Sequence, residues 1–165
     1  MSDCCKIHSD ADIQANTSLC WQCGLEGKPV DQITLDALLK PELLAEVNGR
    51  NYAFCETMNC PVVYFAGDGT LFTKDQVRIR IGIKETENPL SVCYCFGVTE
   101  RMIREEIQGT GRSTAATRIR AEVKAGNCRC EVENPSGRCC LGEVIQTEKQ
   151  AATEIKGRGP AFAAL

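Results

Sequence analysis

The spacing of apolar and polar residues predicts a series of short strands in the first half of the chain. These strands are expected beside a glycine, a cysteine or a proline, at 28–33, 51–54 and 62–65. From 77 to 83 apolar and polar residues alternate with period two, which indicates a further strand within 71–83. One short helix is expected at 34–39, with Thr34 as its N-cap.

Beyond residue 90 the apolar positions recur at helical spacing. The first predicted helix runs from 100 to about 108 with Thr99 as N-cap, and the second runs over 114–125 with Ser113 as N-cap. A last helix is predicted at 141–156. The apolar faces of the first two helices consist of Met102, Ile103 and Ile107, and of Ala115, Ile119 and Val123.

These patterns predict an α+β protein with two small domains. A β-rich domain at 19–88 is followed by a helix-turn-helix-like domain at 89–156 that ends in a C-terminal helix, with the boundary at the polar segment before Pro89. The ends, 1–18 and 157–165, are expected to be flexible tails.

Composition narrows the function classes. A formal net charge of −3 argues against a dedicated nucleic-acid binder, although the second helix carries several basic residues. No apolar run approaches the ~18 residues of a membrane span, and the N-terminus has no apolar signal-peptide core. We therefore expect a cytoplasmic protein.

Cysteine usage is the strongest chemical signal. The 12 cysteines fall in six pairs, namely 4/5, 20/23, 55/60, 93/95, 128/130 and 139/140. Cytosolic thiols are kept reduced, so close pairs indicate metal binding more than disulfides. A secreted disulfide scaffold is the alternative, and the missing export signal disfavours it.

The single histidine, His8, removes several kinds of site. A zinc finger with two histidines and a Rieske centre both need a second histidine. Cys4 and Cys5, near His8, form a weaker pair, which we interpret as a transient site for a soft metal such as Cu(I).

Four cysteines of the β-rich domain predict a structural zinc site. Cys20 and Cys23 precede a glycine in a knuckle-like sequence, and Cys55 and Cys60 form a second pair at another turn. Thiolate-rich, closed, tetrahedral coordination is typical of structural zinc. Such a site has no vacant position for catalysis.

The remaining pairs predict a [2Fe–2S] cluster. Cys93 and Cys95 supply two thiolates from one loop, and four are usually needed. The turn at 134–137 brings the end of the segment back toward its start. The other two positions have four candidates, which the residues alone leave undecided: Cys128, Cys130, Cys139 and Cys140.

Three stretches resemble the N-terminal region of archaeal-type CopZ copper chaperones. They are 52–65, 92–99 and 134–140, and the similarity extends from about Leu19 to Leu141. The resemblance implies one zinc and one [2Fe–2S] cluster, the latter in a part similar to bacterioferritin-associated ferredoxin. By position it implies zinc ligands at Cys20, Cys23, Cys55 and Cys60, and iron ligands at Cys93, Cys95, Cys130 and Cys140.

The chain departs from the resembled family after Cys140, where it has no further cysteine and so no C-terminal copper-binding motif. The leading hypothesis is one-electron transfer in copper handling, such as reducing Cu(II) to Cu(I) for a separate copper-binding domain or an efflux ATPase. A ferredoxin-like carrier or adaptor unrelated to copper, and a structural or sensing iron–sulfur module, are the alternatives. We expect no catalytic acid–base residues.

Overall fold

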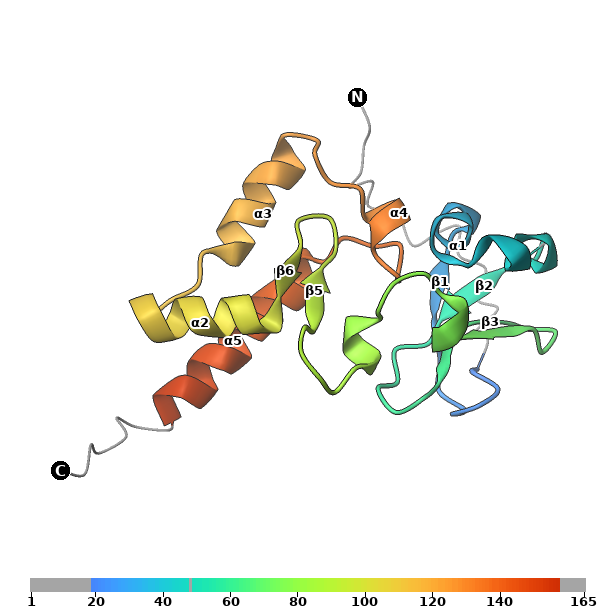
Figure 1. The fold of residues 1–165 in the computed structure, drawn as a ribbon, viewed down its shortest axis with the longest axis horizontal. Coiled ribbons are helices and arrows are strands. Elements are labelled where there is room, and N and C mark those ends of the chain that lie inside the picture. The colour runs from blue at the N-terminus through green and yellow to red at the C-terminus, as the bar shows by residue number, and fades with distance from the viewer. Residues whose placement is uncertain (1–18, 48, 158–165) are drawn as a thin grey trace.

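The computed structural model describes residues 19–47 and 49–157. A small antiparallel sheet occupies one end and three longer helices occupy the other, so the predicted α+β class is confirmed (Figure 1). We call 19–84 the sheet region and 91–157 the helical region. The domain limits of 19–88 and 89–156 stay predictions, and the predicted tails lie outside the described residues, except Gly157, which ends a helix.

The sheet region is built from short elements. They are β1 (Lys28–Val30), α1 (Gln32–Leu38), β2 (Tyr52–Phe54), β3 (Val62–Ala66), β4 (Leu71–Thr73) and the 3-10 helices η1 (Pro41–Glu46), η2 (Lys74–Gln76) and η3 (Gly82–Lys84). The strands pair antiparallel in the order β1-β2-β3-β4. All three predicted strand segments contain strands, although the first ends at Val30 instead of Ile33.

Alternate residues of the sheet enter two different cores. Tyr52 and Phe54 of β2 pack with the leucines of α1 in the larger core. Ala53 and Cys55 point to the opposite side, where they join a small cluster that contains Phe65. The period-two geometry of a strand explains this division. One face is therefore covered by a helix, and the other by the turns that carry cysteines.

The expected strand within 71–83 is β4, at Leu71–Thr73, but two more detailed predictions for this region are wrong. The alternating segment 77–83 is not a strand: Val77 makes an isolated bridge to Leu39, and the chain then enters η3. Val77 and Ile81 are nevertheless buried. The alternation therefore reflects which side chains face the core, and it does not indicate hydrogen bonding to a neighbouring strand. Thr34 is not an N-cap, because α1 begins at Gln32 and Thr34 is buried within it.

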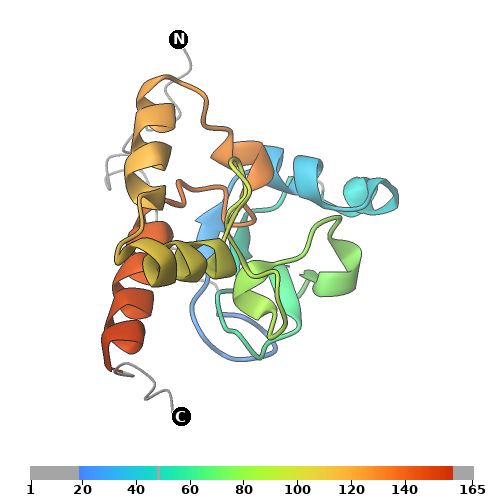
Figure 2. The same cartoon turned by 60° about the vertical axis from the view of Figure 1, so that its left-hand side comes forward.

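The helical region contains a hairpin and four helices. They are β5 (Ser91–Cys93), β6 (Val98–Thr99), α2 (Glu100–Thr110), α3 (Ala115–Lys124), α4 (Cys130–Glu133) and α5 (Leu141–Gly157). Thr99 accepts a hydrogen bond from the Met102 amide, as an N-cap does, and Gly111 ends α2 in the left-handed region at φ 82°. The long helix α5 packs against both α2 and α3 (Figure 2).

Most predicted features of the helical region are confirmed. Ile103 and Ile107 are buried, as predicted. Met102 is an exception, because its side chain is 46% exposed. The predicted N-cap of α3 is wrong: the helix begins at Ala115 with Thr114 as its N-cap, and the Ser113 hydroxyl accepts from the Ala115 amide in the turn before it. The hairpin around Cys95 and the single turn of α4 were not predicted, since two strands of two or three residues and a four-residue helix leave no periodicity.

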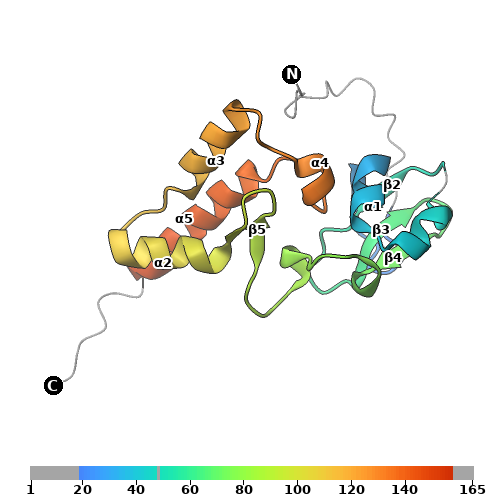
Figure 3. The ribbon, with the colours of Figure 1, turned by 45° about the horizontal axis from the view of Figure 1, so that its top comes forward.

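The two regions meet where α4 packs against α1 (Figure 3). The buried Thr34 hydroxyl donates to the Glu131 carbonyl oxygen at 2.7 Å. The Tyr64 hydroxyl of β3 donates to the Pro135 carbonyl oxygen at 2.8 Å in a buried hydrogen bond. These bonds attach the loop that precedes Cys139 and Cys140 to the sheet region.

We expect Tyr64→Phe to lower the free energy of unfolding by about 1–3 kcal/mol, because it leaves the buried Pro135 carbonyl without its donor. Urea unfolding of the metal-loaded protein measures this. Tyr52→Phe is the matched control, since the buried Tyr52 hydroxyl has no hydrogen-bond partner among the described residues. An equal loss in both variants would contradict the importance of the Tyr64 hydrogen bond.

Candidate metal centres

Four cysteines of the sheet region, the sheet thiol group, converge on one point: Cys20, Cys23, Cys55 and Cys60. Their sulfur atoms all lie within 4.8 Å of one another, with 3.8 Å between Cys20 and Cys60 and 3.7 Å between Cys23 and Cys55. Three of the thiols are buried and Cys23 is half-buried. This compact arrangement suits a single tetrahedral ion held by four thiolates.

Tight turns place these sulfur atoms. Gly24 has φ 72° and its amide donates to the Cys20 carbonyl at 2.7 Å, which closes the first turn. Cys55 follows β2 directly, and the Cys60 amide donates to the Thr57 carbonyl at 3.1 Å before β3 begins. Backbone amides also point at the sulfur of Cys20, which favours the thiolate that a metal requires.

The thiols of this group differ in acidity. Burial opposes ionisation of Cys23, but hydrogen bonds outweigh it, the largest from the Thr57 hydroxyl at 3.3 Å, and lower its pKa to about 6. Burial raises the pKa of Cys60 to about 12. Burial also raises the pKa of Cys20. Because a metal binds thiolates, loading the site must release protons from these buried thiols.

Lys84 is a buried cation beside the sheet thiol group that the sequence interpretation did not include. Its side chain is 5% exposed, and its ammonium group donates to the carbonyl oxygens of Thr57 at 2.9 Å and Cys60 at 3.1 Å. Four thiolates around a divalent ion carry a net negative charge, which a nearby ammonium group offsets. A lone lysine in a polar segment gave no sequence signal for this role.

A second set of cysteines, the helical thiol group, lies in the core of the helical region: Cys93, Cys95, Cys128, Cys130 and Cys140. Cys93 ends β5, and Cys95 lies in the tight turn of the hairpin, which closes at Gly97 with φ 63°. Cys130 begins α4, and Cys140 directly precedes α5. Segments far apart in sequence therefore bring these thiols together.

Sulfur contacts connect this group into a continuous series. The Cys95 and Cys130 sulfur atoms are 3.5 Å apart. Cys140 contacts both Cys93 and Cys130. Cys130 thus lies between Cys95 and Cys140, and Cys128 lies 3.1 Å from the Cys130 sulfur and within 4.8 Å of the Cys95 sulfur. A two-iron cluster needs four thiolates spread more widely than a single ion does, and this series has that form.

The remaining predicted residues lie elsewhere. Cys139 is half-buried and acts on Cys140 electrostatically, without belonging to the compact thiol groups. Cys4, Cys5 and His8 lie outside the described residues, so the prediction of a transient soft-metal site there stays a prediction.

Comparison with known proteins agrees with the sequence interpretation. Residues 17–78 match a CopZ family described as a zinc binding domain. The chain is 39% identical over 145 residues to the copper chaperone CopZ of Archaeoglobus fulgidus, which covers 83% of this chain and 68% of that protein. This chain belongs to the CopZ family.

The fold agrees with a solved structure of the CopZ family. The X-ray structure of the Archaeoglobus fulgidus CopZ N-terminal domain superposes with a TM-score of 0.66 at 38% identity, over 77% of this chain and 95% of that domain. The zinc binding match spans all of the sheet thiol group. The chain is thus a CopZ homologue with a zinc binding domain at the sheet region.

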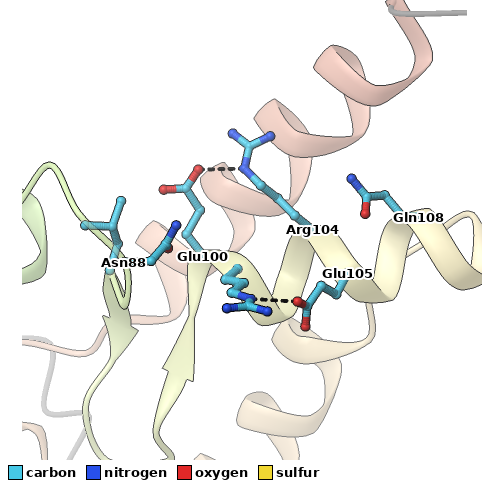
Figure 4. Close-up of a pocket in the computed structure, with 7 residues that line it drawn as sticks. Asn88, Glu100, Arg104, Glu105 and Gln108 are labelled. Carbon is cyan, nitrogen blue, oxygen red and sulfur yellow. Dashed lines mark hydrogen bonds and ion pairs between the residues drawn. The ribbon is translucent and has the colours of Figure 1, made fainter. Parts of the chain in front are cut away.

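Two hollows lie outside the thiol groups. One of about 360 Å³ runs along α2 (Figure 4), where Arg101 pairs with Glu105 and Arg104 pairs with Glu100, both at 2.7 Å. Arg104 also reaches Glu154 of α5 at 2.8 Å. The charged side chains therefore pair with one another. The lining residues of this hollow include no thiol, so it offers no thiolate ligand to a soft metal.

The second hollow is a cleft of about 410 Å³ between the sheet and helical regions. Its lining includes Met58, Tyr94 and four glutamates but no lysine or arginine. Three of these glutamates are neutralised by cations outside the lining: Glu56 pairs with Lys28, Glu85 with Lys74 and Arg80, and Glu100 with Arg104. Among the described residues, no helix is both long and apolar enough to cross a membrane.

We expect Thr57→Val to weaken zinc binding by about 10-fold, because it removes the hydroxyl that stabilises the Cys23 thiolate. Competition with a chromogenic zinc chelator measures the affinity. Thr153→Val on the exposed face of α5 is the control and should leave the affinity unchanged. Equal affinities in the wild type and the Thr57 variant would refute the role of this hydroxyl.

Proposed function

We propose that this CopZ homologue transfers single electrons in copper handling, reducing Cu(II) to Cu(I). The observation that carries the proposal is one cluster that holds the buried Cys93, Cys130 and Cys140 beside the half-buried Cys95, whose sulfur lies 3.5 Å from that of Cys130. Copper handling is supported by the relationship to a copper chaperone.

The sheet thiol group is the proposed zinc site. Cys20, Cys23, Cys55 and Cys60 would each supply one thiolate, which fills a tetrahedral coordination shell. With three of the four thiols buried and no position left open, the role is structural. Zinc there would hold the knuckles against the sheet and supply folding free energy.

The proposed [2Fe–2S] ligands are Cys93, Cys95, Cys130 and Cys140. Cys130 is preferred to Cys128 because it contacts both Cys95 and Cys140, and Cys140 is preferred to Cys139 because it is the buried member that contacts Cys93. When bound, such a cluster exchanges one electron. The protein excludes water from three of these thiols.

Cys95 marks the route by which electrons would reach the surface. It is half-exposed, as are its neighbours Tyr94 and Phe96, while Cys93, Cys130 and Cys140 are buried. Each Cu(II) ion reduced to Cu(I) takes up one electron, which an external redox partner must replace. Soft thiolates bind Cu(I) well, so the product suits transfer to another thiol site.

Transfer requires partners. We propose that Cu(I) passes to a separate copper-binding domain or to a copper-transporting ATPase, with Cys4 and Cys5 as a transient site. The cytoplasm, where thiols stay reduced, is the compartment that fits this chemistry.

One observation favours a different role. Four of the five cysteines in the helical thiol group are fully buried in the core of the helical region, beside Ile103 and Val144. A cluster there would also hold β5, α4 and α5 together, so a structural or sensing module is the second candidate. A carrier unrelated to copper differs only in its partners. A cluster that cannot be reduced at physiological potentials would favour the structural role.

Anaerobically purified protein should contain about two irons and one zinc per chain, with a reversible one-electron couple. We expect Cys93→Ala to lose the iron, its visible absorption and the reduction of Cu(II), because Cys93 is a buried ligand whose sulfur contacts Cys140.

The zinc content of Cys93→Ala is the internal control, since Cys93 lies outside the sheet thiol group and zinc should be retained. Metal analysis, EPR of the reduced protein and a Cu(I)-specific chelator provide the measurements. Undiminished iron in this variant would contradict the ligand assignment, and wild-type protein with a full cluster but no Cu(II) reduction would contradict the function.

A further inference from the structure

Cys128 is a thiol that the proposed four-ligand cluster does not use. Its side chain is 5% exposed, and its sulfur lies 3.1 Å from the sulfur of Cys130. The sulfur atoms of Cys95, Cys128 and Cys130 all lie within 4.8 Å of one another. Cys128 therefore shares with Cys130 the position opposite Cys95.

The backbone gives the two cysteines different degrees of restraint. Cys130 begins α4, and its carbonyl accepts the Asn134 amide at 2.9 Å. Cys128 lies in the connection between α3 and α4, two residues after Gly126, which has φ 78°. Cys130 is thus held by a helix, while Cys128 stands in a loop that can adjust over the same site.

We propose that Cys128 is a reserve iron ligand, able to take the coordination position of Cys130. This inference rests on the proposed cluster. In the exchange, the iron–sulfur bond to Cys130 breaks, a bond to Cys128 forms, and the proton of the Cys128 thiol passes to the Cys130 sulfur. No electron is transferred, and the charge of the site is unchanged.

The other spare cysteine does not have this placement. Cys139 is adjacent to Cys140 in sequence, but it is half-buried whereas Cys140 is buried. Neighbouring side chains in a chain entering a helix point in different directions. In the described part of the chain, no second thiol is placed to replace Cys140. Cys140→Ala is therefore the matched comparison for Cys130→Ala.

A reserve ligand gives the cluster tolerance to damage at one position. If the iron–sulfur bond to Cys130 breaks and the Cys130 sulfur takes up the proton of Cys128, Cys128 can keep the iron coordinated without movement of α4. The proposal accordingly concerns retention of iron and not the electron-transfer step.

The test compares four variants purified anaerobically: Cys128→Ala, Cys130→Ala, the Cys128→Ala/Cys130→Ala double variant and Cys140→Ala. Iron content, visible absorption and EPR report the cluster, and zinc content reports folding of the sheet region. We expect Cys128→Ala to keep the wild-type spectrum, and Cys130→Ala to keep about half or more of the iron with a shifted spectrum. The double variant and Cys140→Ala should lose the cluster and keep zinc.

Several results would overturn the inference. Loss of iron in Cys130→Ala would show that Cys128 cannot substitute, and iron retained in the double variant or in Cys140→Ala would show that rescue is not specific to Cys128. Loss of iron in Cys128→Ala would show that Cys128 is a resident ligand and not a reserve. The proposal that the wild-type protein holds a cluster would still stand. Wild-type protein without iron would instead refute the proposed function, and the inference with it.

Discussion

The far face of the four-stranded sheet has too few apolar side chains to form an ordinary core. The cluster on that face consists of six buried residues, and three of them are cysteines. Of the rest, Phe65 is the only large aromatic residue. Coordination of a metal by the sheet thiol group would do there what leucines and tyrosines do on the face covered by α1. Folding of this face of the sheet would for this reason depend on metal binding.

The two thiol groups are connected through a short segment. Lys84 of η3 donates to the carbonyls of Thr57 and Cys60 in the sheet thiol group. Two residues earlier, the Gly82 amide donates to the hydroxyl of Tyr94 at 2.8 Å, and Tyr94 lies between Cys93 and Cys95. Gly82 also lies so close to Ser91 that a Cβ atom would fall 2.1 Å from the Ser91 carbonyl oxygen. The single turn η3 therefore donates hydrogen bonds to residues of both candidate centres.

Sequence reasoning succeeded where the determinants are local. Thr99 caps α2 as predicted, and the cysteine pairs at 20/23 and 55/60 lie in turns because a turn is a property of a few adjacent residues. The start of α3 was missed by one residue, since its N-cap is Thr114 and not Ser113. The choice of Cys130 and Cys140 came from a resemblance, since it depends on how α4 and α5 approach the hairpin. Lys84 could not be found, because its burial results from tertiary packing. The strand predicted at 77–83 is absent for a similar reason. Its alternate side chains are buried, but no neighbouring strand is available for hydrogen bonding.

The order of the cysteines along the chain has a consequence for biosynthesis. All of the sheet thiol group precedes residue 61, whereas the helical thiol group is complete only at Cys140. Domains generally fold as they emerge during synthesis, with the N-terminal part first. The sheet region and η3 can therefore be in place before the last cysteine of the helical thiol group has been made. The Gly82 amide of η3 is then available to the Tyr94 hydroxyl when the hairpin that carries Cys93 and Cys95 folds.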